Sequence, residues 1–591
     1  MRRSGTLRRV LRHLPLLVAL CGAVLSVRPD RARVHAQEPQ ASAPRAPRAA
    51  APIDLTGYWV AVVTEEWLWR MTTPQKGDYT SIPLSDAGRQ VANDWDPATD
   101  GSCKAYGAVG LMHMPTRLHI TWDGDSVLKV ESDAGAQTRL LRFDRSQAPG
   151  ARSLQGHSTA EWEPIGGPSP PPVVRAGRGV APVALAGGAL KVATTNLSEG
   201  WLRKNGVAYS ERTSVQEYWD RTTFPNGDTW LIVTAIVNDP VYLVSDYTTS
   251  MHFKREPDGA KWKPSACKPS GQAEGQSGGQ SQGQTPGPTP GPTPGPTPGP
   301  ALGQASGPTP RQGQTPAAAR EQPQMVDLAG SWAMSNDEEL LIRIDPGPEL
   351  GNFTGFPLNA AGRQKALTWN STIQALPEHQ ARPHPVSYSM RGPGPNFHMG
   401  EIIDPVSRRL IGYTITGLFE NANRTIWLDG RPHPSEYAEH LWSGFSTGVW
   451  ENGMLKVTTT HMKQMFLQRN GIPVSPYAVM TEFLIRHGTL LMLISQVDDP
   501  IYLEEPMVRT STWRWNPGQR EQPIGQVEIA EELPDLKLGD VPSYPLGTRH
   551  PEYAEANKLP FEATLGGKET LYPEYLEKLR QLRESAKGTS R

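Results

Sequence analysis

Short runs of apolar and β-branched residues recur along the chain, separated by turn signals. Two of them, 231–237 and 490–494, are apolar along most of their length, which is typical of strands in a core. Asn205-Gly206 and Asn470-Gly471 lie between short alternating runs. This dipeptide is the strongest local hairpin signal, because both central residues of the turn take positive φ. The pattern predicts antiparallel β-structure with few helices.

A few segments depart from the β pattern. Residues 86–93 and 360–367 predict one short helix in each half of the chain. Ser85 and Asn359 precede them and are natural N-caps. Near the C-terminus, residues 574–586 have apolar side chains on one face of a short amphipathic helix. We expect this helix to dock on its own module or to fray, rather than to bind a membrane.

The predicted strands occur in two series that resemble each other. The first copy opens with residues 53–60, which contain Gly57-Tyr58-Trp59, and the second opens with residues 326–333, which contain Gly330-Ser331-Trp332. Further matches in the same order are Pro83-Leu84 with Pro357-Leu358, Leu190-Lys191-Val192 with Leu455-Lys456-Val457, and Asp239-Pro240 with Asp499-Pro500. Ordered self-similarity predicts two copies of one β-rich module. The Asp-Pro pairs are expected to end strands and set turns, because Pro cannot continue a ladder.

The two copies are joined by a segment rich in Pro, Gly and Gln. It repeats Thr-Pro-Gly-Pro and has few large apolar side chains, so burial cannot offset the entropy cost of ordering it. We interpret it as a disordered spacer, and interpret 163–187 as a surface loop of the first module. The predicted organisation is a signal peptide at 1–36, a disordered lead-in at 37–52, a first β-barrel module at 53–268, the linker at 269–325, a second β-barrel module at 326–518 and an extended tail with a short helix at 519–591.

The N-terminus predicts export to a bacterial periplasm or to the medium. Several arginines precede an apolar stretch at 14–27, and Val34-His35-Ala36 offers a cleavage site before Gln37. The apolar stretch is short for a membrane span, and a retained anchor is the alternative. After cleavage only Cys103 and Cys267 remain. In an oxidising compartment two such cysteines favour a disulfide, with two unpaired side chains as the alternative.

Composition excludes some classes of function. Lys and Arg number 59 and Asp and Glu 60, with no long basic run after the signal, which argues against a nucleic-acid partner. The sequence has no phosphate-binding Gly loop, nucleophile elbow, His-Glu-x-x-His or Cys-x-x-Cys element, and no cofactor is predicted. The 17 Trp against 11 Phe suit a ligand cavity and also suit barrel packing.

The two Gly-x-Trp openings resemble the motif that begins the first strand of lipocalin-type barrels. About 200 residues per copy suit one such barrel or a sandwich. The resemblance implies that Trp59 and Trp332 plug one end of each barrel, with a basic residue of the last strand packed over each indole. The expected cations are Lys254 or Arg255 in the first copy and Arg514 in the second. An ordinary buried Trp in an unrelated β fold is the alternative.

A second resemblance concerns the second copy. Residues 424–434, Arg-Thr-Ile-Trp-Leu-Asp-Gly-Arg-Pro-His-Pro, resemble the signature of a large family of secreted bacterial β-rich proteins without an assigned function. The likeness continues from Trp442 to Val457 and covers most of 326–518. The first copy lacks the Asp-Gly-Arg-Pro-His-Pro element. If that element carries function, the two copies are not equivalent.

The same region holds the densest polar cluster of the chain. Its members are Asp429, Arg431, His433, Glu436, Glu439 and His440. Imidazoles and carboxylates this close can bind a ligand or a metal, or supply a general acid and base. However, Pro432 and Pro434 flank His433, and the histidine spacing is not that of a zinc site, so a hydrogen-bonded or solvated loop is favoured. His461 is expected to face the same region, and Asn196 is its counterpart in the first copy.

Glu217 and Glu482 occupy equivalent positions in apolar strands. A carboxylate that faces inward can bind a ligand's polar group, because a buried charge needs a partner. The favoured alternative is a position on the face of the strand that meets water.

These observations favour a non-catalytic, exported binding protein that holds a small apolar or amphipathic molecule in one or both barrels. The alternatives are an enzyme that uses the 429–440 loop and an envelope module that binds another protein. Barrels support all three roles, so fold alone does not decide. The candidate ligand-binding residues are Trp59, Trp332, Glu217, Glu482, Asp429, Arg431, His433 and His461. No metal site and no catalytic residue are predicted.

Overall fold

The computed structural model describes residues 45–164, 188–268, 326–335, 337–339, 348–376, 383–390, 396–417, 423–519 and 540–589. The predicted signal peptide and linker lie outside the described residues, as do half of the lead-in and most of the 163–187 segment. One compact unit begins at Ala46 and contains both β-rich modules.

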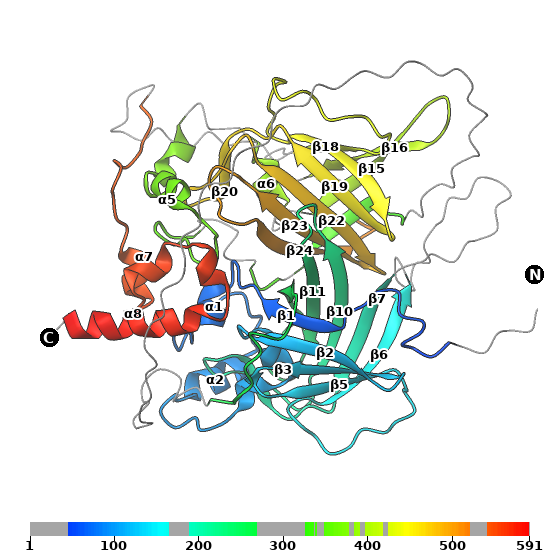
Figure 1. Cartoon of the computed structure of the whole chain (residues 1–591), viewed down its shortest axis with the longest axis vertical. Helices are drawn as coiled ribbons and strands as arrows, with labels where there is room; N and C mark the ends of the chain where they lie inside the picture. Colours follow the sequence, from blue (N-terminus) through cyan, green and yellow to red (C-terminus); the bar gives the residue numbers. More distant parts are fainter. Residues whose placement is uncertain are drawn as a thin grey trace, which may run out of the picture. The chain divides into compact units, whose positions relative to one another are not determined.

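The first module is a closed barrel of nine strands (Figure 1). Its strands are β1 (Gly57–Ala61), β2 (Arg117–Asp123), β3 (Val127–Ser132), β5 (Thr138–Arg142), β6 (His157–Pro164), β7 (Gly188–Thr195), β10 (Ser214–Thr223), β11 (Thr229–Asn238) and β12 (Tyr247–Glu256). Their order around the barrel is β1-β12-β11-β10-β7-β6-β5-β3-β2.

The second module repeats this architecture. Its strands are β14 (Gly330–Met334), β15 (Phe397–Ile403), β16 (Leu410–Thr416), β17 (Arg424–Trp427), β18 (Phe445–Glu451), β19 (Met454–Thr460), β22 (Val479–His487), β23 (Leu490–Asp498) and β24 (Met507–Trp515). Their order is β14-β15-β16-β17-β18-β19-β22-β23-β24, again closed. Neighbours are antiparallel except for one parallel pair in each barrel, β5 with β6 and β17 with β18. The prediction of tandem β-barrels is confirmed, although lipocalins have eight strands and each barrel here has nine.

Two hairpins lie outside the barrel sheets. They are β8 (Gly200–Arg203) with β9 (Val207–Tyr209), and β20 (Met465–Gln468) with β21 (Ile472–Val474). Asn205-Gly206 and Asn470-Gly471 lie in their turns, as predicted, but only the glycine of each pair has positive φ, so the turns are not of the expected type. Gly206 and Gly471 have φ of 82° and 94°. A Cβ atom at Gly206 would lie 2.2 Å from the Trp95 ring, so close approach as well as backbone conformation requires glycine there.

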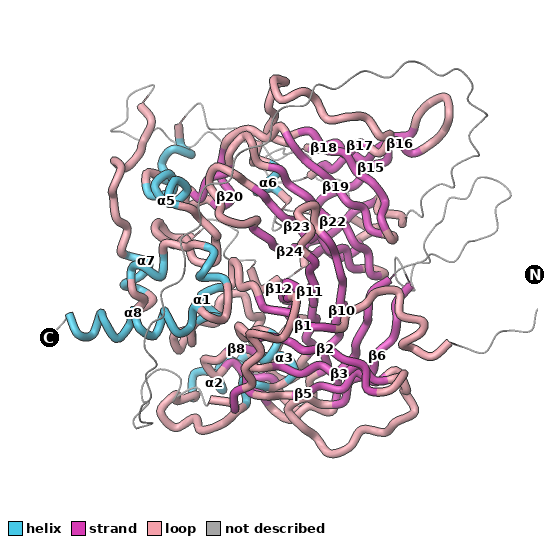
Figure 2. Tube along the Cα trace, in the orientation of Figure 1, coloured by secondary structure: helices cyan, strands magenta, loops and turns pink. Residues whose placement is uncertain are grey.

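The helices are short (Figure 2). They are α1 (Trp67–Met71), α2 (Asp86–Asp94), α3 (Ala108–Met112), α5 (Ala360–Leu367), α6 (Val386–Ser389), α7 (Glu552–Ala556) and α8 (Tyr575–Thr589). α2 and α5 are the predicted pair, and both caps form as expected. The side chain of Ser85 accepts a hydrogen bond from the Gly88 amide at 3.1 Å. Asn359 accepts one from the Gly362 amide at 2.9 Å. None of the described helices is long and apolar enough to cross a membrane.

The C-terminal helix α8 packs against the first module. The Tyr575 and Trp67 rings meet edge to face, with centroids 6.1 Å apart. Trp67 Nε1 donates to the Thr570 carbonyl at 2.8 Å, and Arg117 donates to the Glu574 carboxylate at 2.6 Å. The sequence predicts that this helix docks on its own module or frays; it docks, and its apolar contacts include residues of the first module. Its apolar face meets the α1 segment, which lies far away in the sequence.

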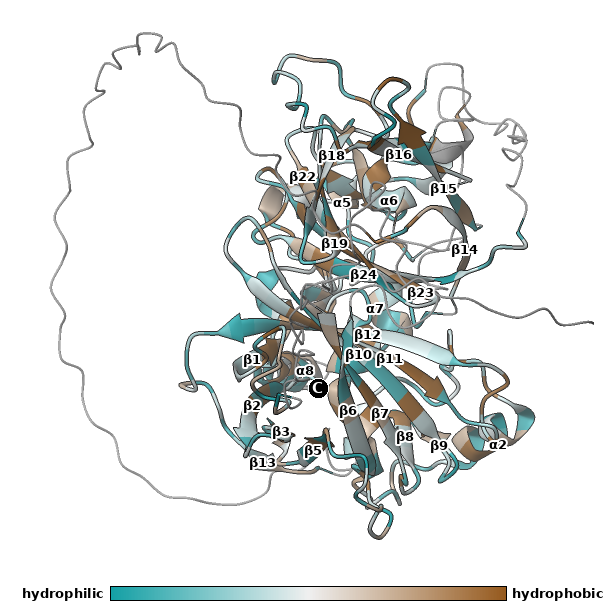
Figure 3. Cartoon of the chain, turned by 90° about the vertical axis from the view of Figure 1, so that its right-hand side faces the viewer, coloured by the Kyte–Doolittle hydropathy of each residue, from teal (hydrophilic) through white to brown (hydrophobic). Residues whose placement is uncertain are grey.

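Each barrel has its own apolar core, and hydrophobic and hydrophilic segments alternate along the strands (Figure 3). A third cluster of buried apolar residues joins the two barrels. It contains Val62, Tyr218, Phe224, Trp230 and Ile232 of the first module together with Phe483, Ile485, Leu490, Met492, Ile494 and Val508 of the second. The barrels therefore share a buried apolar contact, which positions the residues discussed below.

Asp239 and Asp499 end strands as predicted. The Asp239 carboxylate accepts hydrogen bonds from the amides of Ser210, at 2.6 Å, and Val241, at 2.8 Å. Asp499 accepts the equivalent bonds from Ser475, at 2.6 Å, and Ile501, at 2.9 Å. Each carboxylate thus fixes the turn after its strand and ties it to the hairpin that precedes the barrel strand.

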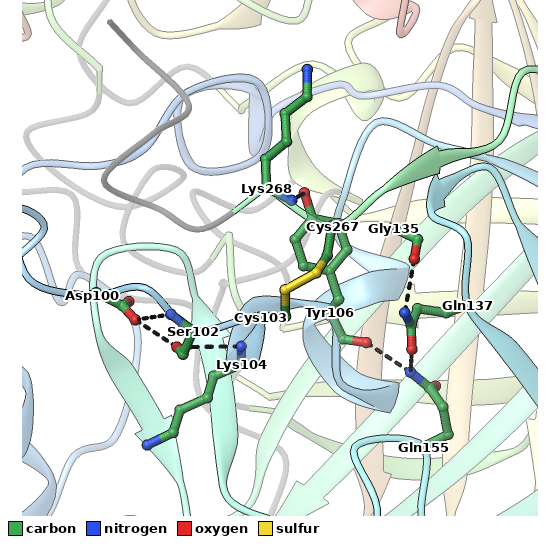
Figure 4. The surroundings of a disulfide bond; sticks show 10 residues. All are labelled: Asp100, Ser102, Cys103, Lys104, Tyr106, Gly135, Gln137, Gln155, Cys267 and Lys268. Carbon is green, nitrogen blue, oxygen red and sulfur yellow. Dashed lines mark hydrogen bonds between the residues drawn. A yellow bond between two sulfur atoms is a disulfide. The ribbon is translucent and has the colours of Figure 1, made fainter. Parts of the chain in front are cut away.

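Cys103 and Cys267 form a disulfide, with Cα atoms 5.9 Å apart (Figure 4). Cys267 follows the short strand β13 (Ser265–Ala266), which pairs with β4 (Ala134–Gly135). The amide of Lys268 donates to Tyr106 Oη at 3.1 Å. The bond therefore ties the end of the first module to a loop near its beginning.

Candidate functional site

Trp59 and Trp332 lie in the barrel cores and are fully buried. Trp59 Nε1 donates to the Leu55 carbonyl at 2.9 Å, and Trp332 Nε1 makes the equivalent bond to Leu328 at 3.0 Å. The Arg255 guanidinium lies 5.7 Å from the Trp59 ring centroid, as one of the two expected cations. Both indoles therefore pack in the barrel cores, and both ring N–H groups are already hydrogen-bonded.

The expected cation over Trp332 is a different residue. Arg514 pairs with Asp246 at 3.2 Å instead. The guanidinium of Arg486, from β22, lies 5.3 Å from the Trp332 ring. The reason is the register: the residue opposite Trp59 is Arg255, whereas the residue opposite Trp332 is Trp515, so the last strand of the second barrel supplies an indole. The cation then comes from β22, which pairs with neither β14 nor β24.

Glu217 and Glu482 are buried, with 1% and 0% of their surface exposed. Arg139 makes two hydrogen bonds to the Glu217 carboxylate, at 3.1 and 2.7 Å. Arg424 makes the same two-pronged pair with Glu482, with Nη1 at 3.0 Å from Oε1. The favoured expectation that these carboxylates face water is therefore wrong. They face inward, and an arginine of the same barrel neutralises each one.

Hydroxyl groups complete both ion pairs. In the first barrel Arg139 donates to Thr194 at 3.2 Å, and Thr194 is hydrogen-bonded with Ser158 at 2.8 Å. The second barrel repeats the arrangement with Arg424, Thr459 and Ser446. The four side chains stand on four neighbouring strands in each case. Such a buried network fixes the barrel interior, and because each carboxylate is paired with an arginine it offers no free carboxylate to a ligand. Sequence reasoning missed both arginines.

The Asp429 loop is held together by local contacts. The Arg431 guanidinium makes hydrogen bonds to both carboxylate oxygens of Asp429, at 2.9 and 2.6 Å. Hydrogen bonding from Arg431 lowers the pKa of Asp429. The same guanidinium stacks 3.5 Å from the Trp427 ring centroid. This ion pair therefore stabilises the loop at the protein surface.

His433 and His461 are brought together by Thr460. Thr460 Oγ1 lies 2.7 Å from Nδ1 of each imidazole. His433 Nε2 lies 2.8 Å from Thr447 Oγ1, and His461 Nε2 donates to the Ser435 carbonyl at 2.8 Å. Burial, followed by the nearby His461, lowers the pKa of His433. Hydrogen bonds thus occupy every ring nitrogen of both residues, which favours a structural role.

The candidate residues do not form one site. His433 contacts Thr447, whereas the network of Glu482 includes the adjacent Ser446. Successive residues of a strand point to opposite faces, so the histidines lie outside the second barrel and Glu482 lies inside it. Within the described part of the chain, no group of three or more His, Cys, Asp or Glu side chains is arranged to hold a metal ion.

A cavity of about 340 Å³ lies between the two barrels. Its polar lining includes Asp220, Arg221, Thr222, Glu451 and His487, and its apolar lining includes Ile53, Ala189, Met454, Phe483 and Ile485. The ends of β10 and β22 therefore meet here, together with the turn between β18 and β19. Neither barrel supplies the whole lining.

His487 anchors one wall of this cavity through residues of the other barrel. Its Nδ1 donates to Glu163 at 2.6 Å, and its Nε2 donates to Asp220 at 3.0 Å. The Tyr218 ring stacks on the imidazole with centroids 4.3 Å apart. All three charged groups are buried. Burial opposes the charged imidazole, but the attraction and hydrogen bonds of the two carboxylates prevail and raise the pKa of His487 to about 10.

Sequence reasoning missed this group, and it interpreted Glu163 as the start of a surface loop. That interpretation is wrong for Glu163, which stands near the end of β6 and has 3% of its surface exposed. The available signal was that Asp220 and His487 interrupt apolar strands near their ends. Their partners, however, belong to different modules.

A second buried polar cluster crosses between the modules. Glu338, which follows β14, lies 2.9 Å from Arg70 and 3.4 Å from Arg203 of the first module. It also accepts a hydrogen bond from Thr249 at 2.8 Å. Its repeat equivalent, Glu65, lies 3.8 Å from Arg509 of the second module. Each module therefore supplies a carboxylate that pairs with an arginine of the other module.

Comparison with known proteins found no matching family model, no matching curated protein and no matching solved structure. The fold and its contacts define a protein of two tandem nine-stranded β-barrels that share a polar-lined cavity at their contact.

Proposed function

We propose that this protein is an exported, non-catalytic binding protein that holds a small amphipathic molecule in the cavity between its barrels. The observation that carries the proposal is the cavity of about 340 Å³, which falls within the size range of small-molecule sites. Its lining combines apolar side chains with a few convergent polar groups, and this combination is typical of ligand pockets.

The proposed site is between the barrels rather than inside either one. Trp59 and Trp332 belong to packed cores, and the inward carboxylates of Glu217 and Glu482 are already paired with arginines. A ligand inside a barrel would have to displace these side chains. At the contact, by contrast, space is already available.

The disulfide between Cys103 and Cys267 supports export, because such bonds persist mainly in oxidising compartments. The Arg-rich N-terminus with its apolar stretch supports the same proposal, as does the resemblance of residues 424–434 to secreted proteins. A periplasmic or secreted location is therefore part of the proposal.

The test uses a neutral fluorescent probe, N-phenylnaphthylamine, whose emission rises in apolar surroundings. The full mature chain should bind it saturably with one probe per chain. Thr223→Trp introduces a bulky side chain at an exposed residue of the cavity lining and should weaken binding at least tenfold. The matched control is Thr229→Trp at the cross-strand partner, which is not part of the lining, and it should bind as the wild type does. Non-saturable binding, or equal binding by both variants, would overturn the proposal.

A further inference from the structure

We propose that the cavity between the barrels selects an amphipathic carboxylate, whose anionic group binds Arg221. This inference rests on the proposed function of the cavity and adds the chemical class of its ligand. It is carried by an arginine of the cavity lining that makes no hydrogen bond or ion pair within the described residues.

Arg221 stands on β10 and lines the cavity. Its side chain is half-buried, and within the described residues it has no hydrogen bond or ion pair. Outside the lining, the carboxylate of Asp54 is attracted by Arg221 and is hydrogen-bonded with Thr56. Asp54 is attracted more strongly to Arg255 than to Arg221. The guanidinium of Arg221 is therefore available to a ligand.

Comparison of the two copies explains why Arg221 is free. Its repeat equivalent is Arg486, since each follows its buried glutamate by four residues. Arg486 is 5% exposed, packs over Trp332 and donates to the carbonyl oxygens of Gly488 and Asp327. In the first barrel, Arg255 supplies the cation over the indole. Arg221 therefore does not need to pack over the indole of its barrel, as Arg486 does in the second barrel.

The charges around the cavity leave one cation to be matched. His487 is bound by Asp220 and Glu163, so this trio carries one net negative charge. Arg486, which also lines the cavity, adds one positive charge and donates to main-chain carbonyl oxygens. Glu451 is paired with Lys456 at 3.3 Å. Together with Arg221, the charged lining residues and their ion-pair partners carry one net positive charge, which favours a ligand with a single negative charge.

The groups around Arg221 fit a carboxylate attached to an apolar body. A guanidinium presents parallel N–H donors that match the two oxygens of a carboxylate. Phe483, Ile485 and Met454 form the apolar part of the lining and suit the remainder of such a molecule.

Two probes of nearly the same shape test the inference: naphthoate, a carboxylate, and naphthamide, its neutral analogue. Calorimetric titration of the full mature chain should give at least tenfold tighter binding of naphthoate, equivalent to about 1.4 kcal/mol. Arg221→Gln should abolish this preference, and Arg221→Lys should retain part of it. Arg212→Gln, at an exposed position outside the lining, is the matched control and should keep the full preference.

The outcomes separate the inference from the proposed function. Equal binding of acid and amide by the wild type would overturn the inference and leave the binding function standing. A naphthoate preference that persists in Arg221→Gln would overturn the role of Arg221. Failure of both probes to bind, together with failure of N-phenylnaphthylamine, would overturn both proposals. Should Arg221→Gln not fold, the acid-to-amide ratio in the wild type and in Arg221→Lys still decides.

Discussion

The proton on His487 links the stability of the contact between the barrels to pH. The imidazole is buried between Glu163 and Asp220, and its pKa is raised from 6.5 to about 10. Because the folded-state pKa lies above the unfolded-state value, the stabilisation is fully present below the unfolded pKa. It is lost as the pH rises through about 10. Alkaline conditions should therefore weaken the contact.

The expected loss can be worked from the pKa difference. Between about pH 7 and about pH 9.5 the folded protein keeps a proton that the unfolded chain has mostly released, and each pH unit then costs about 1.4 kcal/mol. Partial protonation of the unfolded chain at the lower limit, and partial deprotonation of the folded protein at the upper one, reduce the total to about 3 kcal/mol. Ordinary Asp and Glu side chains do not titrate in this range. Burial raises the pKa of several tyrosines, such as Tyr209 and Tyr218, and these add a smaller slope near the upper limit, so His487 supplies most of the loss.

Urea unfolding followed by tryptophan fluorescence at the two pH values measures this loss. The wild type should lose about 3 kcal/mol of unfolding free energy. His487→Gln should be less stable at neutral pH and should lack most of the pH dependence. His157→Gln, at the start of the strand that carries Glu163, is the matched control and should keep the wild-type slope. A flat profile in the wild type, or an unchanged slope in His487→Gln, would refute the reasoning.

Three further predictions concern buried charges and the disulfide. Glu338→Gln removes the carboxylate that the second module lends to Arg70, and urea unfolding should show a loss of about 3 kcal/mol, whereas an unchanged midpoint would count against the cross-module network. Arg424→Met leaves Glu482 unpaired and should cost about 3 to 5 kcal/mol; adding Glu482→Leu should recover most of that loss, and no recovery would contradict the pairing. Cys103→Ser should cost about 2 to 5 kcal/mol, and reductant should destabilise the wild type but not the variant.

Local chemistry is the part of this fold that the sequence reveals. Asn205-Gly206 predicts its hairpin because glycine readily takes the positive φ that the turn requires. Ser85 predicts the start of α2 because its side chain satisfies an amide three residues away. Asp239 predicts a strand end for the same kind of reason. These signals depend only on residues that are close in the sequence. Each one recurs in the second copy, so each prediction is supported twice.

The position of Glu217 could not be predicted in the same way. The alternation of a strand gives two opposite faces, and a register shift of one residue exchanges them. Its partner Arg139 is 78 residues away, so the ion pair exists only once the barrel has closed. The repeat itself contains one usable signal for these ion pairs. Each copy has an arginine, Arg139 or Arg424, that pairs with the equivalent glutamate. Two matching arginines and two matching glutamates in apolar strands indicate paired charges.

The cavity explains why the chain contains two copies that have diverged. His487 is equivalent to Thr222, and Ile485 is equivalent to Asp220, so the same two strand positions carry different side chains in the two barrels. In the contact these differences are complementary, because His487 of one barrel meets Asp220 of the other. Two identical barrels would bring either two histidines or two carboxylates to this place. A single barrel would lack either Arg221 or the apolar wall around Phe483. The proposed site therefore requires both copies, and it requires them to differ.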